Sequence, residues 1–100
     1  MRYKFEQYLI KQGYSVYTPS GNPSTVYDYI KRIDKIIEWE NLYSWEDLAK
    51  NISKYVSQYN IGGIKEDMGQ KSHAAVINAL LAFQRFLIEE KSGKNAINLF

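Results

Sequence analysis

The sequence contains no cysteine, and this absence excludes whole classes of functional site. Without thiols the chain can form no disulfide bond, no thiolate nucleophile and no cysteine-ligated zinc centre. Histidine is almost as scarce, because His73 stands alone and no clustered carboxylates accompany it. We therefore predict no metal site and no other cofactor. His73 itself is interpreted as a polar residue in the first turn of a helix, with a phosphate or base contact as the alternative.

Long apolar runs are missing as well. The first ten residues, MRYKFEQYLI, lack the apolar core of a secretory signal, and no window approaches the length of a membrane span. We expect a soluble cytoplasmic protein with no membrane partner. A strong excess of one charge is also absent, since the net charge is only +2. This value permits DNA binding without arguing for it, because dedicated DNA binders usually carry a larger basic excess.

Recognisable catalytic motifs are absent too. The pattern GxxxxGK[ST] does not occur, so no P-loop is predicted. The segment IGGIKEDMG does not join a strand to a helix, and we interpret it as a flexible turn rather than a phosphate cradle. Carboxylates lie among lysines at helical spacing, which is typical of solvated faces. A tyrosine nucleophile would need a base and clustered cations. We expect neither an enzyme nor a small-molecule substrate.

What is present indicates one all-α domain. The chain has 100 residues, of which 45% are hydrophobic and 24% charged. Asn22 and Pro23 are expected at the N-cap and first turn of one helix, and Ser44 with Asp47 resembles a capping box for the next. Gly13 and Gly93 are expected to end helices. Apolar spacing predicts four helices and no strand, with these approximate bounds: 2–12, 22–40, 44–59 and 72–90.

The predicted fourth helix is apolar around most of its circumference from Val76 to Ile88. A helix of this kind is normally buried, so we expect it to be the central rod of the fold. One polar lane remains on it, formed by Lys71, Asn78 and Arg85. On the predicted second helix, four polar residues lie opposite the apolar face: Ser24, Tyr27, Lys31 and Lys35.

Several stretches, taken in order, resemble a known family. STVYDYIKRIDKIIEW places a threonine four residues before a tyrosine and an aliphatic ladder. A Trp-Leu helix, a glycine loop and SHAAVINALLAFQRFLIEEK follow, and FEQYLIKQGYS precedes them. This order resembles the N-terminal core-binding domain of tyrosine recombinases, the SAM-like domain of phage integrases, over roughly residues 3–92.

The resemblance implies a four-helix bundle that closes around duplex DNA together with a catalytic domain. In that family the second and fourth helices supply most contacts. By resemblance, Thr25 is placed near the phosphate backbone and Tyr29 at a packing position. The basic pair that often follows this tyrosine is displaced here by one residue, to Lys31 and Arg32.

The residues expected to contact DNA are polar groups on these two helices. Hydroxyls, an amide and basic side chains suit phosphate contacts and one or two base contacts. The alternative is that they form the solvated faces of any helical bundle. The predicted DNA-binding residues are Ser24, Thr25, Tyr27, Lys31, Lys35, Lys71, His73, Asn78 and Arg85.

Residues 1–92 are expected to form the domain, and residues 93–100 a tail or the start of an interdomain linker. The recombinase catalytic residues belong to a further domain, so we expect weak binding of double-stranded DNA and no strand transfer. A recombinase catalytic domain or another protein is a further expected partner. The alternative function is a protein-interaction domain that docks to a recombinase or another DNA enzyme.

Overall fold

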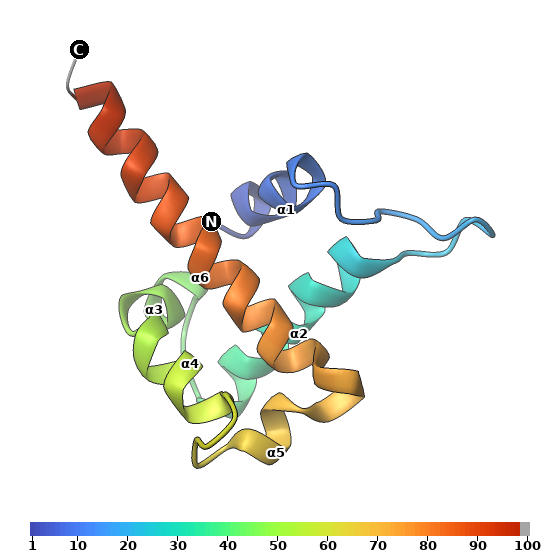
Figure 1. Cartoon of the computed structure of the whole chain (residues 1–100), viewed down its shortest axis with the longest axis vertical. Coiled ribbons are helices and arrows are strands. Elements are labelled where there is room, and N and C mark those ends of the chain that lie inside the picture. Colours follow the sequence, from blue (N-terminus) through green and yellow to red (C-terminus); the bar gives the residue numbers. More distant parts are fainter. Residues whose placement is uncertain (99–100) are drawn as a thin grey trace.

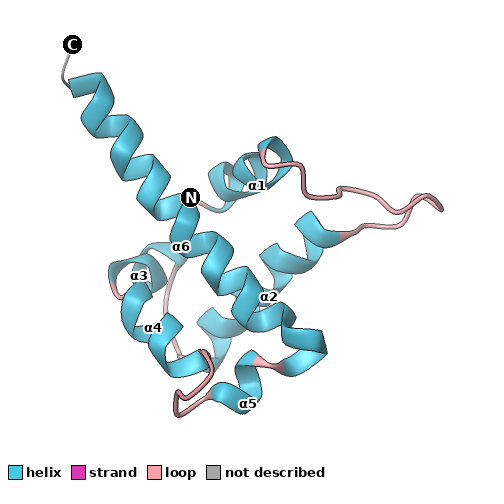
Figure 2. Cartoon of the chain, in the orientation of Figure 1, coloured by secondary structure: helices cyan, strands magenta, loops and turns pink. Residues whose placement is uncertain are grey.

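The computed structural model describes residues 1–98, with side chains to residue 92, and this part of the chain is helical without a β-strand. The all-α prediction is therefore confirmed (Figures 1 and 2). Within the described residues no helix is both long and apolar enough to cross a membrane. The helices are α1 Arg2–Lys11, α2 Thr25–Trp39, α3 Trp45–Lys50, α4 Ile52–Tyr59, α5 Glu66–Gly69 and α6 Lys71–Asn98.

Helix α6 is the element around which the others are arranged. It contacts α1, α2, α4 and α5. Ile88 departs from the apolar pattern, because its side chain is 60% exposed. It follows Arg85 by three residues on the outer side, where the C-terminal part of α6 projects beyond the other helices (Figure 1). The buried residues of α6 are Val76, Ile77, Ala79, Leu80, Ala82, Phe83 and Phe86.

The segment between α1 and α2 is a narrow backbone hairpin. Gly13 leaves α1 at φ 92°, the positive value expected there. The Thr18 N–H then donates to the Asn22 carbonyl and the Ser24 N–H donates to the Val16 carbonyl, at 2.8 and 2.9 Å. Because Pro23 pairs with Tyr17 in an isolated antiparallel bridge and α2 begins only at Thr25, the expected cap at Asn22 with Pro23 in the first turn is wrong. Ser24 is the N-cap of α2. We call residues 14–24 the hairpin.

The predicted third helix is broken in two at Asn51, whose backbone leaves helical geometry at φ −127° and ψ 33°. Its start is as predicted, because the Ser44 hydroxyl accepts from the Asp47 N–H at 3.2 Å. The Asp47 carboxylate accepts from the Tyr43 N–H at 3.1 Å, one residue before the position expected for a capping box. The break turns α4 relative to α3, and side chains of both helices reach the core.

The glycine segment before α6 is not a simple turn, because it contains the short helix α5 and two of its glycines are closely packed. A Cβ atom on Gly69 would lie 1.9 Å from the Tyr59 carbonyl oxygen, and one on Gly63 would lie 2.2 Å from that of Ser57. Only glycine permits these approaches, which bring α5 against the end of α4. This segment therefore fixes where α6 begins.

A left-handed turn joins α5 to α6. Ser72, His73 and Ala74 have φ values of 56°, 58° and 66°, and the Ala74 N–H donates to the Gln70 carbonyl at 3.0 Å. The expected right-handed start at Ser72 is therefore wrong. Side chains normally disfavour this conformation by about 1–2 kcal/mol per residue. The turn lets the chain reverse direction between the packed α5 and the buried α6.

The end of α6 also differs from expectation. Its helical backbone passes through Gly93 and continues to Asn98, so Gly93 does not end the helix. Glycine weakens a helix interior without forbidding it. The side chains of the expected tail, residues 93–100, lie outside the described residues.

A polar cluster ties α2, α4 and the segment before α5 together. The Tyr59 hydroxyl donates to the Glu40 carboxylate at 2.7 Å, and the Lys65 ammonium pairs with the same oxygen. Burial alone would raise the pKa of Glu40, but the hydrogen bonds from Lys65 and Tyr59 outweigh it and lower that pKa. Burial and the Glu40 contact raise the pKa of the Tyr59 phenol. The cluster therefore links these elements through an ion pair and a hydrogen bond.

Replacing Leu80 with alanine should lower the free energy of unfolding by about 2–5 kcal/mol, because the side chain is fully buried and leaves a cavity. Ile88→Ala is the matched control on the same helix and should change stability by less than about 1 kcal/mol. Urea denaturation measures both. Similar losses for the two variants would contradict the assignment of α6 as the buried helix.

The left-handed turn predicts that a glycine substitution within it raises the stability of the protein, whereas glycine normally lowers the stability of a helix. His73→Gly should stabilise the protein by about 0.5–1 kcal/mol, because glycine adopts positive φ without steric cost. Lys91→Gly, in the exposed right-handed part of α6, should instead destabilise it by about 0.5 kcal/mol. Thermal melts compare the two. Destabilisation by both would show that Ser72–Ala74 belong to an ordinary right-handed helix.

The Glu40 cluster predicts a pH dependence. Because the folded pKa of Glu40 is lowered, its stabilisation is present above the unfolded value of about 4.3 and is lost as pH falls through the folded pKa. Glu40→Gln should reduce stability by about 1–3 kcal/mol at pH 7, and this difference should shrink below about pH 4. Glu38→Gln is the control, since that side chain is 69% exposed. A pH-independent difference would refute the charge-based explanation.

Candidate nucleic-acid interface

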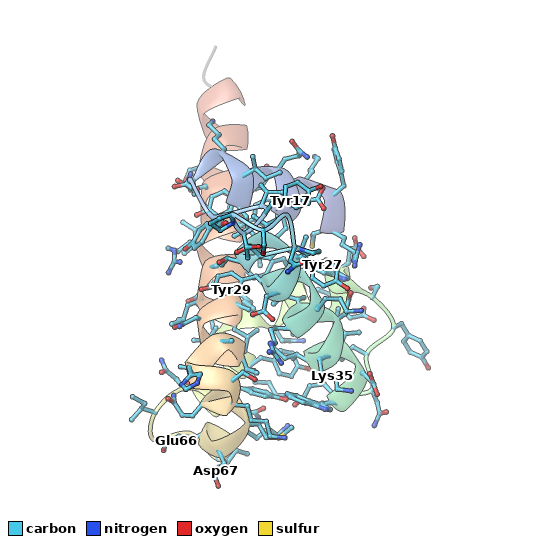
Figure 3. The ribbon with its side chains drawn as sticks, turned by 90° about the vertical axis from the view of Figure 1, so that its right-hand side faces the viewer. Tyr17, Tyr27, Tyr29, Lys35, Glu66 and Asp67 are labelled. Atoms are coloured by element: carbon cyan, nitrogen blue, oxygen red, sulfur yellow. The ribbon has the colours of Figure 1, made fainter. Side chains whose placement is uncertain are left out.

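The outer face of α2 carries three of the predicted contact residues on one side. Tyr27 is 54% exposed, and Lys31 and Lys35 are exposed one and two turns further along. The Lys31 ammonium lies 5.9 Å from the centroid of the Tyr27 ring, within the range of a cation–π contact. Lys35 pairs loosely with Glu38 at 3.5 Å. Figure 3 shows Tyr27 and Lys35 on the side of α2 away from α6.

Ser24 and Thr25 lie at the N-terminus of the same helix, and both are half-buried. The Ser24 side chain makes no capping hydrogen bond, so its hydroxyl is available to a ligand. Asp28 in the first turn reduces the positive potential there, although Arg32 pairs with it at 3.3 Å. These two hydroxyls extend the outer face of α2 by one turn.

The predicted residues of α6 form a separate group. Arg85 donates to the Tyr14 hydroxyl at 3.2 Å and lies near Tyr29, which faces the α6 side of α2 in Figure 3. Burial is the main cause that raises the pKa of Tyr29, and the nearby Arg85 cation opposes it. Asn78 is exposed on the same outer side of α6. Arg85 is thus partly engaged within the fold.

Lys71 and His73 do not continue the lane of Asn78 and Arg85. The seven-residue spacing that predicts one lane assumes a right-handed helix throughout, and the left-handed residues 72–74 interrupt it. Lys71 instead places its ammonium 5.4 Å from the Trp39 ring at the end of α2, and His73 is exposed in the turn itself. The expectation of a single lane through Lys71 is wrong.

At Tyr27 the outer face of α2 borders the hairpin and α1. Between these three elements lies a hollow of about 410 Å³, which we call the hairpin hollow. Tyr17, from the hairpin, is 66% exposed and lines the hollow together with Tyr27 (Figure 3). Tyr17 is not among the residues predicted from the sequence. Weak alternation in YSVYT indicates extended backbone there, and Tyr17 pairs with Pro23 in an isolated bridge. The full lining is Arg2, Glu6, Ile10, Val16, Tyr17, Pro23, Val26, Tyr27 and Ile30.

Two charged groups stand in the lining of the hairpin hollow. The Arg2 guanidinium donates to Asp34 at 2.9 Å, and this hydrogen bond raises the pKa of Arg2 although partial burial opposes the shift. Asp34 is itself held by the indole N–H of Trp45, also at 2.9 Å. Glu6 makes no ion pair with any side chain that the structure describes. The hollow therefore offers one fixed donor group and one free acceptor group.

The described residues contain no candidate metal-binding site. No three of their histidine and carboxylate side chains come close enough together to hold an ion. The polar groups of the α2 face and of the hairpin hollow are hydroxyls, ammonium groups, one guanidinium and one carboxylate. Such groups can bind phosphates and base edges through hydrogen bonds and charge.

No family model, curated protein or solved structure matches this chain. Its function is therefore inferred from the arrangement of its own residues.

Proposed function

We propose that this chain is a non-catalytic module that holds duplex DNA weakly through the phosphate backbone, in the cytoplasm. The observation that carries the proposal is the outer face of α2. Lys31 and Lys35 stand there one turn apart, with Tyr27 beside them and the Ser24 and Thr25 hydroxyls at the helix start. This combination of cations and hydroxyls is typical of phosphate contacts.

The proposed architecture is a SAM-like core-binding bundle of four helices. In this assignment α1, α2 and α6 correspond to the first, second and fourth helices, and α3 with α4 to the third. Helix α5, with only four residues, is then an insertion in the connection to α6. Support comes from the packing of α6 against α1, α2 and α4, together with the order of sequence motifs.

The remaining predicted residues have secondary roles in this proposal. Asn78 and Arg85 on α6 contact a neighbouring stretch of the DNA backbone. Lys71 and His73 lie at the N-terminal end of α6. A few phosphate contacts imply non-specific dissociation constants of about 10⁻⁴–10⁻⁶ M near physiological salt, weakening steeply as salt rises. A recombinase catalytic domain is a suitable further partner, because it would supply the affinity that this face lacks.

Absence of strand-transfer chemistry is part of the same proposal. A phenol acts as a nucleophile more readily when its pKa is lowered. The three tyrosines with shifted values move the other way: burial is the main cause that raises the pKa of Tyr8, Tyr29 and Tyr59. None of these shifts favours attack on a phosphate.

Charge reversal tests which face holds DNA. Lys31→Glu with Lys35→Glu reverses the α2 face, and Lys50→Glu with Lys54→Glu makes the same charge change on α3 and α4. Fluorescence anisotropy with a labelled duplex over a salt series should show at least tenfold weaker binding for the α2 pair only. Melting temperatures should change little for either pair, because exposed charges contribute little to stability.

Equal binding by the wild type and both double variants would contradict the proposal. A third pair, Asn78→Asp with Arg85→Glu, measures the contribution of α6, which we expect to be smaller. Loss of binding only in this third pair would move the DNA contact from α2 to α6.

A protein-interaction domain is the second candidate, and exposed apolar side chains favour it. Ile61 and Ile64, in the loop between α4 and α5, are 77% and 84% exposed. Exposed apolar residues that lie close together often mark a protein contact. Ile61→Ser with Ile64→Ser should leave DNA binding unchanged. If the wild type does not bind DNA but pulls down a recombinase catalytic domain through these residues, this second function replaces the first.

A further inference from the structure

We infer that the hairpin hollow receives one unpaired nucleobase from a DNA strand held on the outer face of α2. The inference rests on the proposed function and adds a substrate class to it: duplexes that carry an unpaired or unstacked base. The hollow adjoins the proposed phosphate contacts, because Tyr27 belongs both to its lining and to the α2 face.

The size and lining of the hollow suit a flat aromatic ligand. Its volume of about 410 Å³ lies within the range of small-molecule sites, which is roughly 300–1,000 Å³. Val26 and Ile30 are buried beneath it, so its floor is apolar. Tyr17 and Tyr27 keep 66% and 54% of their surfaces exposed at its edge. Exposed aromatic rings are the groups on which unpaired bases stack.

Tyr17 is held on a well-defined backbone. The hairpin is closed by hydrogen bonds on both sides of this residue, from Ser24 to Val16 and from Thr18 to Asn22. The Gly21 N–H donates to the Thr18 carbonyl at 2.9 Å and completes the turn. A side chain carried on such a scaffold loses less freedom on binding, which favours affinity. The two tyrosines can therefore receive a base without rebuilding the hairpin.

The polar groups of the hollow match the edge of a base. Arg2 can donate, and Asp34 holds its guanidinium in place from one side. Glu6 can accept, and no described side chain pairs with it. Every base edge presents acceptors, donors or both, and arginine and carboxylate side chains are common partners for them. An apolar hollow with a few polar groups is typical of a ligand site.

Charge beside the hollow favours a nucleic acid over a peptide as the occupant. The Lys31 ammonium lies over the Tyr27 ring, and Lys31 forms no ion pair with a described side chain. Lys35 follows one turn later on the same face. A strand whose base enters the hollow would leave its phosphates next to these two cations. The tyrosines at the edge of the hollow would thus bind a base, and the two lysines would bind the phosphates next to it in the same strand.

The test compares three labelled duplexes in anisotropy titrations at one salt concentration. The first is fully paired, the second carries a single bulged thymidine, and the third carries the same bulge with an abasic residue. Wild-type protein should bind the thymidine bulge about 5- to 100-fold more tightly than the paired duplex. The abasic bulge should lose this preference, because the backbone distortion remains but the stacking base is gone.

Variants assign the preference to the hollow. Tyr17→Ala and Tyr27→Ala should each remove it, whereas Tyr27→Phe should keep it because the stacking ring remains. Tyr43→Ala is the matched control, since that tyrosine is 98% exposed and lies outside the hollow. A bulged 2-aminopurine should also change its fluorescence on binding wild-type protein, and this readout does not depend on any variant folding.

The outcomes separate the two proposals. Equal affinity of wild-type protein for all three duplexes, with unchanged 2-aminopurine fluorescence, overturns the base-binding inference and leaves the DNA-binding function standing. Binding of no duplex overturns both. A preference that survives Tyr17→Ala and Tyr27→Ala shows that a bulge is recognised elsewhere, and this too rejects the hollow.

Discussion

The burial of α6 is the constraint on which the rest of the structure depends. Its surface is apolar around most of its circumference from Val76 to Phe86, and no single neighbour can cover it. Helices α1, α2, α4 and α5 therefore approach it from different sides. Helix α2 buries its aliphatic stripe, from Val26 to Ile36, against α6 and the neighbouring α1 and leaves its opposite face in solvent. The exposed position of Lys31 and Lys35 is thus a consequence of how α6 is covered.

Covering the first buried turn of α6 requires unusual backbone. The chain must come down α4, turn at the glycines and enter α6 within a few residues, which brings Gly69 against the Tyr59 carbonyl and forces residues 72–74 into the left-handed region. Strain of this kind persists only when the surroundings hold it in place. The Glu40 carboxylate, bound by Tyr59 and Lys65, joins the elements that surround the turn. The close approach of Gly69, the strained residues 72–74 and the Glu40 cluster therefore occur together at one end of the molecule.

Local signals predicted part of this structure well. The aliphatic spacing of α2, the Ser44 cap and the buried run of α6 depend on residues within a few positions of one another, and these predictions are confirmed. The break at Asn51 and the left-handed turn leave the apolar spacing unchanged, so that spacing does not reveal them. The hairpin is closed by hydrogen bonds between residues 16 and 24, which depend on backbone pairing and not on apolar spacing. The residues of the candidate site were likewise predicted only in part. Tyr27, Lys31 and Lys35 share a face as predicted, whereas the lane through Lys71 fails at the left-handed turn and Tyr17 was missed.

The candidate interface lies where substitution is least costly to the fold. Tyr17, Tyr27, Lys31 and Lys35 are all exposed, and none belongs to the buried core or to the Glu40 cluster. Their side chains contribute little to the free energy of unfolding. The folded structure therefore does not require two aromatic rings at the edge of an apolar hollow, with two cations beside them. The proposed ligand matches this arrangement, because a nucleic-acid strand carries flat rings, hydrogen-bonding edges and regularly spaced negative charge.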